Sequence, residues 1–130
     1  HLINPNNLVK EISKILKPGG IVLSHVPNHF PLWGRIKFLF QNDIDTFNYF
    51  QDSDRYDFPH LRFFTCQSKI KMYQMENFDY LENLSFYFYK FPVLDRVLPV
   101  NIKKLLCRIS TNNFSEGITM IFRKKSENVL

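Results

Sequence analysis

The sequence has few cysteines and no long apolar segment. Its 130 residues include two cysteines, Cys66 and Cys107, which are too few for a disulfide framework. We therefore expect reduced thiols and a cytoplasmic protein. No apolar run approaches the ~20 residues that a membrane-spanning helix needs, and the first residues do not read as a basic-then-apolar leader. We expect no membrane partner.

Basic residues are in excess, but they are not concentrated. The chain has 17 Lys and Arg against 12 Asp and Glu, which gives a formal net charge of +5. The densest basic runs are residues 103–104 and 123–125, whereas nucleic-acid binders gather such residues on one face or in one cluster. The acidic segment from Asp43 to Asp57 would repel phosphate. We therefore expect no nucleic-acid partner.

The composition that remains is that of a globular domain. Hydrophobic residues make up 45% and charged residues 22%, which argues against a disordered tail. The length fits one domain. Because the chain begins with His-Leu-Ile rather than Met, we expect residues 1–130 to form a single partial domain of a longer protein.

The first part of the chain predicts a helix, a tight turn and a buried strand. Over residues 4–17, Asn4 can cap a helix, Pro5 fits its first position, and apolar residues recur at helical spacing. Residues 18–20, Pro-Gly-Gly, end it, because proline cannot continue the hydrogen-bond ladder and glycine tolerates a positive φ. Residues 21–26 are almost continuously apolar, which predicts a strand buried on both faces in a parallel sheet.

Residues 29–64 form an aromatic-rich segment. A short helix fits residues 32–40. The part from 42 to 59 has no sustained period, yet it contains five Asp and several aromatic rings. Irregular segments of this size inside a domain are more often functional than not. We therefore expect residues 29–64 to be an insert that serves as a lid or as part of a substrate pocket.

The second half predicts further alternation of helix and strand. Thr65 can cap a helix over residues 65–76, with Lys69 and Lys71 facing outward. Asn77 follows at the position where a left-handed residue commonly closes a helix. The other expected elements are a strand over 80–89, one or two short helices over 93–109, and a last strand over 117–122.

This alternation predicts an α/β layer architecture. Three strands make a small sheet, and the strand over 21–26, if buried, needs a neighbour on each edge. The last strand can supply one neighbour, and no other segment of the sequence supplies the second. We therefore expect an incomplete sheet with one unpaired strand edge.

The order of these segments resembles class I S-adenosylmethionine-dependent methyltransferases. Residues 8–20, which end in Leu-Lys-Pro-Gly-Gly, and the following strand and Pro27-Asn28 look like the helix–turn–strand segment of that family. The opening residues 1–5, His-Leu-Ile-Asn-Pro, are similar to the motif after the family's fourth strand. Two more segments resemble the family, namely the approach to a helix in its small-molecule branch, at 60–65, and its last, antiparallel strand, at 114–124.

The half of the family that binds the cofactor has no counterpart in this chain. In the family a glycine-rich loop after the first strand and an acidic residue ending the second hold the cofactor, whereas this chain has four glycines and no G-x-G. The resemblance thus implies the C-terminal part of a Rossmann-like sheet, with one parallel strand, a terminal antiparallel pair and flanking helices. It also implies S-adenosylmethionine as cofactor, a small-molecule acceptor, and no activity for this chain alone.

Candidate site residues follow from where such sheets bind ligands, which is at the carboxyl ends of their strands. Methyl transfer needs an aligned acceptor and, where the acceptor loses a proton, a base. We expect Asn28, Trp33 and Arg35 to bind the acceptor and His29 to act as the base. Alternatively, His29 is an exposed loop histidine, Trp33 a packing anchor, and Arg35 a partner of the nearby Asp residues.

A second candidate group precedes the helix over 65–76. His60 is the other catalytic candidate, with Arg62 and Tyr56 lining the same pocket. His60 could instead hydrogen-bond the start of that helix. His1 corresponds to a family position near the cofactor. We expect no metal site, because the histidines do not share the helical face that H-x-x-x-H ligands use.

A function of another class fits the same features. A non-catalytic interaction module could complete its sheet by pairing with a partner strand. The reading frame upstream of His1 separates the two hypotheses, since the enzyme requires a strand followed by G-x-G there. An open edge on residues 21–26 also predicts self-association, although the oligomeric state cannot be named from the sequence.

Overall fold

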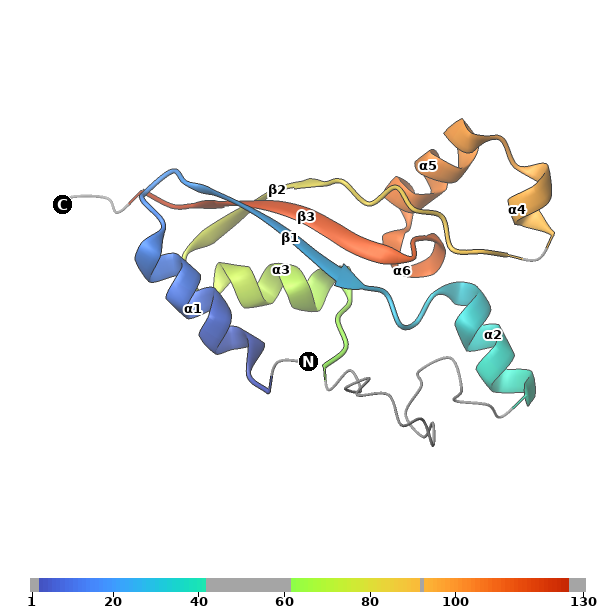
Figure 1. Ribbon diagram of the computed structural model, residues 1–130, viewed down its shortest axis with the longest axis horizontal. Helices are drawn as coiled ribbons and strands as arrows, with labels where there is room; N and C mark the ends of the chain where they lie inside the picture. Colours follow the sequence, from blue (N-terminus) through green and yellow to red (C-terminus); the bar gives the residue numbers. More distant parts are fainter. Residues whose placement is uncertain (1–2, 42–61, 92, 127–130) are drawn as a thin grey trace, which may run out of the picture.

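A computed structural model describes residues 3–41, 62–91 and 93–126 of the chain (Figure 1). These residues form an α/β structure, and most of the aromatic-rich insert lies outside them. In chain order its elements are α1 (Pro5–Ile15), β1 (Ile21–Pro27), α2 (Leu32–Gln41), α3 (Cys66–Gln74), β2 (Phe78–Asn83), α4 (Leu94–Val97), α5 (Val100–Ile109), α6 (Thr111–Phe114) and β3 (Gly117–Lys124).

The predicted helix–turn–strand unit at the start of the chain is confirmed. The Asn4 side chain caps α1 by accepting a hydrogen bond from the Asn7 backbone N–H at 3.3 Å, and Pro5 opens the helix. Gly19 turns the chain with φ +78°, a conformation that side chains with a Cβ rarely adopt. The Gly19 N–H then donates to the Lys124 carbonyl at 2.9 Å, which ties the turn to the end of β3.

The three described strands form an antiparallel sheet in the order β1-β3-β2. Ile21 pairs with Arg123 at one end of the β1–β3 ladder and Pro27 with Gly117 at the other. The expected parallel pairing is absent among the described residues, because the neighbour of β1 is the last strand, which runs the opposite way. The expectation that the last strand pairs with residues 21–26 is confirmed.

β1 is covered on one face only, so the prediction that both faces are buried is wrong for the described structure. Exposed and half-buried residues alternate along the strand. Val22 and Val26 pack against the core cluster beneath the sheet, whereas Leu23 is 65% exposed on the other face. A continuous apolar run does not distinguish a strand buried on both faces from one with an uncovered apolar face.

The core lies between the sheet and the pair α1 and α3, which cover the same face (Figure 1). Tyr73 of α3 stacks on Phe122 of β3 with ring centroids 3.9 Å apart and nearly parallel planes. The buried cluster is Val9, Tyr73, Phe78, Ile118, Met120 and Phe122. Burial of these side chains is the main apolar contribution to the stability of the described fold.

Lys69 was expected to face outward, and this prediction is wrong. Helix α3 begins as predicted, with a capping box between Thr65 and Ser68. Lys69, however, is fully buried, and its Nζ donates to the carbonyl oxygens of Ser24 at 2.9 Å and Ile118 at 2.7 Å. Burial disfavours the charged ammonium and lowers the pKa of Lys69 to about 8.

The segment after β2 also departs from expectation. A strand over 80–89 was predicted, but β2 ends at Asn83, whose side chain accepts a hydrogen bond from the Ser85 N–H at 2.9 Å. Such a bond favours a turn over a strand. Beyond it, Phe88 makes an isolated bridge to Ser115. Helices α4 and α5 match the expected short helices on either side of Pro99, and α6 was not predicted.

We expect Lys69 to make stability depend on pH in the alkaline range. Its pKa falls from 10.5 to about 8 on folding, so between these values the unfolded chain binds more protons. The free energy of unfolding should therefore rise with pH across this window, by about 3 kcal/mol from this group. Urea unfolding should show this rise, and Lys69→Met should remove it. The matched change in exposed Lys71, Lys71→Met, should preserve it, and equal slopes in all three proteins would contradict the assignment.

Candidate functional site

The larger cavity lies where four separate segments of the chain converge. Its volume is about 550 Å³, within the range of small-molecule sites. Helix α2, the segment after β2, helix α4 and the residue before β3 contribute its lining. The lining residues are Trp33, Lys37, Tyr89, Lys90, Phe91, Asp95, Arg96 and Glu116.

Aromatic rings form the inner part of this lining. The Trp33 and Phe91 ring centroids are 6.1 Å apart, and Phe91 is only 6% exposed. Tyr89 meets Phe91 edge to face at 6.3 Å. Trp33 packs against Phe91, as the alternative of a packing anchor predicted, and it also lies in the cavity wall, where substrate binding stays a prediction.

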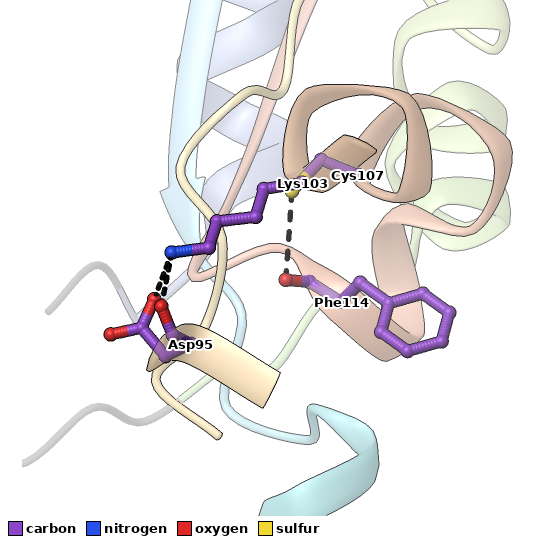
Figure 2. Close-up of polar contacts among 4 residues, drawn as sticks. All are labelled: Asp95, Lys103, Cys107 and Phe114. Carbon is purple, nitrogen blue, oxygen red and sulfur yellow. Dashed lines mark hydrogen bonds and ion pairs between the residues drawn. The ribbon is translucent and has the colours of Figure 1, made fainter. Parts of the chain in front are cut away.

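Exposed basic side chains form another part of the lining. Lys37, Lys90 and Arg96 are exposed, and none of them forms an ion pair within the described residues. Asp95 is already neutralised, since its carboxylate lies 2.7 Å from Lys103 Nζ (Figure 2). The cavity therefore carries an excess of positive charge.

Two further contacts connect α4, which lines the cavity, to α5 and α5 to α6. Lys103 also donates to the Asp95 backbone carbonyl, which joins α4 to α5. The Cys107 thiol donates to the Phe114 carbonyl at 3.6 Å, which joins α5 to the end of α6 (Figure 2). Burial raises the pKa of the Cys107 thiol, so this thiol remains protonated and able to donate.

Tyr89 contributes a neutral polar group to the cavity. Burial, and then the negative charge of Glu116, raises the pKa of the Tyr89 hydroxyl above its ordinary value. The hydroxyl therefore stays protonated at neutral pH and can donate a hydrogen bond to a bound molecule.

A smaller cavity of about 290 Å³ lies beside β1. Arg62 contributes to its lining, and Arg62 Nε donates to the Ile3 carbonyl at 3.0 Å, which holds the start of α1 near this site. The other lining residues are mostly apolar and come from α1, β1, α3 and the segment before α3, namely Pro5, Leu8, Val9, Ser24, His25, Val26, Pro27, Phe64, Met72 and Tyr73. Arg62 thus lies apart from Trp33, in the lining of a different cavity.

Asn28 makes its side-chain hydrogen bonds within the fold. It is buried, and its side-chain amide lies within hydrogen-bond distance of the carbonyls of Thr111, Asn112 and Ser115, the last at 2.8 Å. Its Oδ1 accepts from the Phe30 N–H at 3.2 Å. Both ends of the side chain are used, so the expectation that Asn28 binds substrate is not supported by its surroundings.

Arg35 has a similar structural use. Its Nε donates to the Phe30 carbonyl at 2.8 Å, and its Nη2 donates to the Asn112 carbonyl and, at 2.6 Å, to Asn113 Oδ1. These bonds join the start of α2 to α6. The nearby Asp residues of the alternative lie outside the described residues, and the predicted anion contact stays a prediction.

Of the two catalytic candidates, His29 lies in the described part of the chain and His60 does not. His29 is half-buried, and its ring meets Phe63 edge to face at 5.1 Å. Tyr56, His60 and His1 lie outside the described residues, so their predicted roles stay predictions.

Sequence reasoning missed the lining residues that lie far from α2. Tyr89, Lys90 and Phe91 were assigned to a strand or its end, where their side chains would alternate between faces, and Arg96 to an unspecified short helix. The segment after β2 instead continues alongside β3 and the residues before it, with the Tyr89 N–H donating to the Phe114 carbonyl at 2.7 Å, and this path places Tyr89, Lys90 and Phe91 in the cavity lining. A signal was available, because Lys90 and Arg96 flank a proline beside a run of aromatic residues.

The described residues offer no metal site. No three His, Cys, Asp or Glu side chains gather there as a metal site would require. Both cysteines are free thiols, as predicted. No described helix is both long and apolar enough to cross a bilayer.

Comparison with known proteins assigns no relationship. No protein-family model matches the chain, and no curated protein matches it at the level that marks a relative.

We expect Asn28→Asp to destabilise the fold by about 3 kcal/mol, because a carboxylate would face three carbonyl oxygens where an amide now donates. Urea unfolding followed by circular dichroism measures the change. The matched control is Asn101→Asp at an exposed position in the first turn of α5, where the effect should stay within about 0.5 kcal/mol. Equal losses of unfolding free energy in the two variants would show that the hydrogen bonds of the Asn28 amide do not stabilise the fold.

Proposed function

We propose that this chain is the substrate-side half of an S-adenosylmethionine-dependent methyltransferase that acts on a small molecule or biosynthetic intermediate. The observation that carries the proposal is the outer edge of β1, which lacks both a neighbour among the described strands and the charged side chains that usually protect an edge.

The backbone groups on this edge follow from the register. The Asn28 N–H donates to the Glu116 backbone carbonyl, and the Lys124 N–H donates to the Gly20 carbonyl. Because hydrogen-bonded pairs recur at every second residue of an antiparallel ladder, the even-numbered residues of β1 exchange hydrogen bonds with β3. Odd-numbered residues therefore point their backbone groups away from β3. Ile21, Leu23 and His25 offer outward N–H groups, and Pro27 closes the series because it has none.

The opposite edge of the sheet is protected, which makes the contrast informative. β2 has a register shift between Tyr80 and Glu82, and it carries the charged residues Asp79 and Glu82. Bulges and charges are the usual devices against edge pairing. The sequence of β1, Ile-Val-Leu-Ser-His-Val-Pro, has neither Lys nor Arg nor Asp nor Glu. This edge has the character of a strand that is normally paired.

The local elements also agree with the resemblance in the segments where the two can be compared. The chain has a capped helix, a Leu-Lys-Pro-Gly-Gly turn, a strand ending in Pro-Asn and a final antiparallel strand, in that order. The methyltransferase hypothesis explains why the edge of β1 is bare, because that family places its fourth strand there.

The residues of this chain do not fit the whole cofactor. The sequence has no G-x-G loop to cradle it, so we assign no step to the cofactor here. Bound to the missing half, S-adenosylmethionine would supply an electrophilic methyl group. The part that this chain contributes is the acceptor side, where Trp33, Tyr89 and the basic residues of the larger cavity would hold and orient the acceptor. His29 and His60 stay the proposed bases.

The alternative is a non-catalytic module that captures a partner strand on the same edge of β1. The bare outward N–H groups favour it as directly as they favour a missing strand of the same protein. The larger cavity is better explained by the enzyme, since strand capture gives it no role. The two hypotheses separate on whether the complete reading frame yields a protein that binds S-adenosylmethionine.

We expect calorimetric titration of S-adenosylmethionine into the 130-residue chain to show no binding, and the same titration into the product of the complete reading frame to show micromolar affinity. Substitution of the first glycine in the expected upstream G-x-G should weaken that affinity by about tenfold or more. Micromolar binding by the chain alone would contradict the proposal. So would a complete product that does not bind the cofactor, and that result would favour the module.

A further inference from the structure

We propose that the larger cavity binds a small aromatic acid, that is, an aromatic ring bearing a carboxylate. That this ligand is the methyl acceptor rests on the proposed function, whereas the binding itself does not. The proposal follows from how the lining divides into buried rings and exposed cations.

The rings favour a flat apolar body. Phe91 is almost fully buried, Trp33 and Tyr89 are half-buried, and the Trp33–Phe91 and Tyr89–Phe91 centroid distances are 6.1 and 6.3 Å. Aromatic rings associate in edge-to-face or offset arrangements with centroids between about 4.5 and 7 Å. A ligand ring can therefore extend this aromatic cluster without repacking it.

The charges favour an anion at the exposed side of the cavity. Lys37, Lys90 and Arg96 are exposed and have no ion-pair partner in the described part of the chain. Of the two acidic residues in the lining, Asp95 is bound by Lys103, which leaves Glu116. A carboxylate would meet a surplus of cations, and Arg96 can bind it through two parallel N–H donors.

The remaining polar group fits the same ligand. The Tyr89 hydroxyl stays protonated, since burial and Glu116 raise its pKa, so it can donate to a polar substituent on the ligand ring. A cationic ligand would face Lys37, Lys90 and Arg96 with only Glu116 to offset them. The volume of about 550 Å³ admits one or two fused rings with short substituents.

The sequence contains a single tryptophan, and it lies in this cavity, so in nitrogen-15-labelled protein its indole N–H reports on binding without any mutation. We expect 4-hydroxybenzoate and indole-3-carboxylate, titrated into the chain, to shift the one indole signal in proton–nitrogen spectra. The uncharged amides of the same acids should bind about tenfold more weakly, because they forgo the ion pairs. Cyclohexanecarboxylate should also bind more weakly, because it has no aromatic ring.

Charge-removing variants locate the anion. Lys37→Gln and Arg96→Gln should each weaken 4-hydroxybenzoate binding by about fivefold. The matched control is Lys10→Gln on α1, an exposed lysine outside the cavity, which should leave the affinity unchanged. All three positions are exposed, and retained dispersion of the backbone amide signals in the same spectra verifies that each variant is folded.

No shift of the indole signal with either acid up to about 10 mM would overturn the proposal, since weaker binding has no selective value. Equal binding of acids and amides would overturn the anionic part, and equal binding of the aliphatic acid would overturn the aromatic part. None of these outcomes bears on whether the complete protein binds S-adenosylmethionine. Conversely, a complete protein that ignores the cofactor leaves this binding test unaffected.

Discussion

β1 and β3 are joined by an antiparallel ladder that uses only the even-numbered backbone groups of β1. This ladder joins the beginning of the chain to its end, and the remaining elements are arranged around it. It aligns Val22 and Val26 with the core beneath the sheet, and it accounts for the position of Lys69, which donates to one carbonyl on each strand. The same geometry turns the odd-numbered groups of β1 outward, where no described strand meets them. The functional proposal depends on that asymmetry.

Beyond the carboxyl end of β1, polar side chains form hydrogen bonds within the chain. Asn28 and Arg35 both donate to carbonyl oxygens in and next to α6, so two residues predicted to bind substrate join the end of β1 and the start of α2 to α6. This junction has a consequence for ligand binding. It places Trp33 of α2 opposite the segment that follows β2 and so creates the larger cavity between elements that are distant in sequence. The polar contacts that hold the junction are therefore separate from the groups available to a ligand.

Much of the local structure could be predicted from the sequence, because local rules govern it. Asn4, Gly19, Thr65 and Asn77 occupy the cap and turn positions that their side chains favour, and Asn77 has φ +64°. The failures concern long-range effects. Lys69 can be buried because its ammonium donates hydrogen bonds to two strand carbonyls. The helical pattern of its own segment does not predict partners on distant strands. Of the lining of the larger cavity, the sequence predicted only Trp33, since the other walls depend on the path of the chain after Asn83.

Amide hydrogen exchange along β1 tests the central claim most directly, because neighbouring residues of one strand serve as each other's control. In the 130-residue chain at low concentration, Ile21, Leu23 and His25 should exchange rapidly, while Val22, Ser24 and Val26 exchange slowly through their bonds to β3. In the product of the complete reading frame, the three outward amides should become protected to a similar extent. Outward amides that are already slow in the monomeric chain, or that stay rapid in the complete protein, would contradict the account.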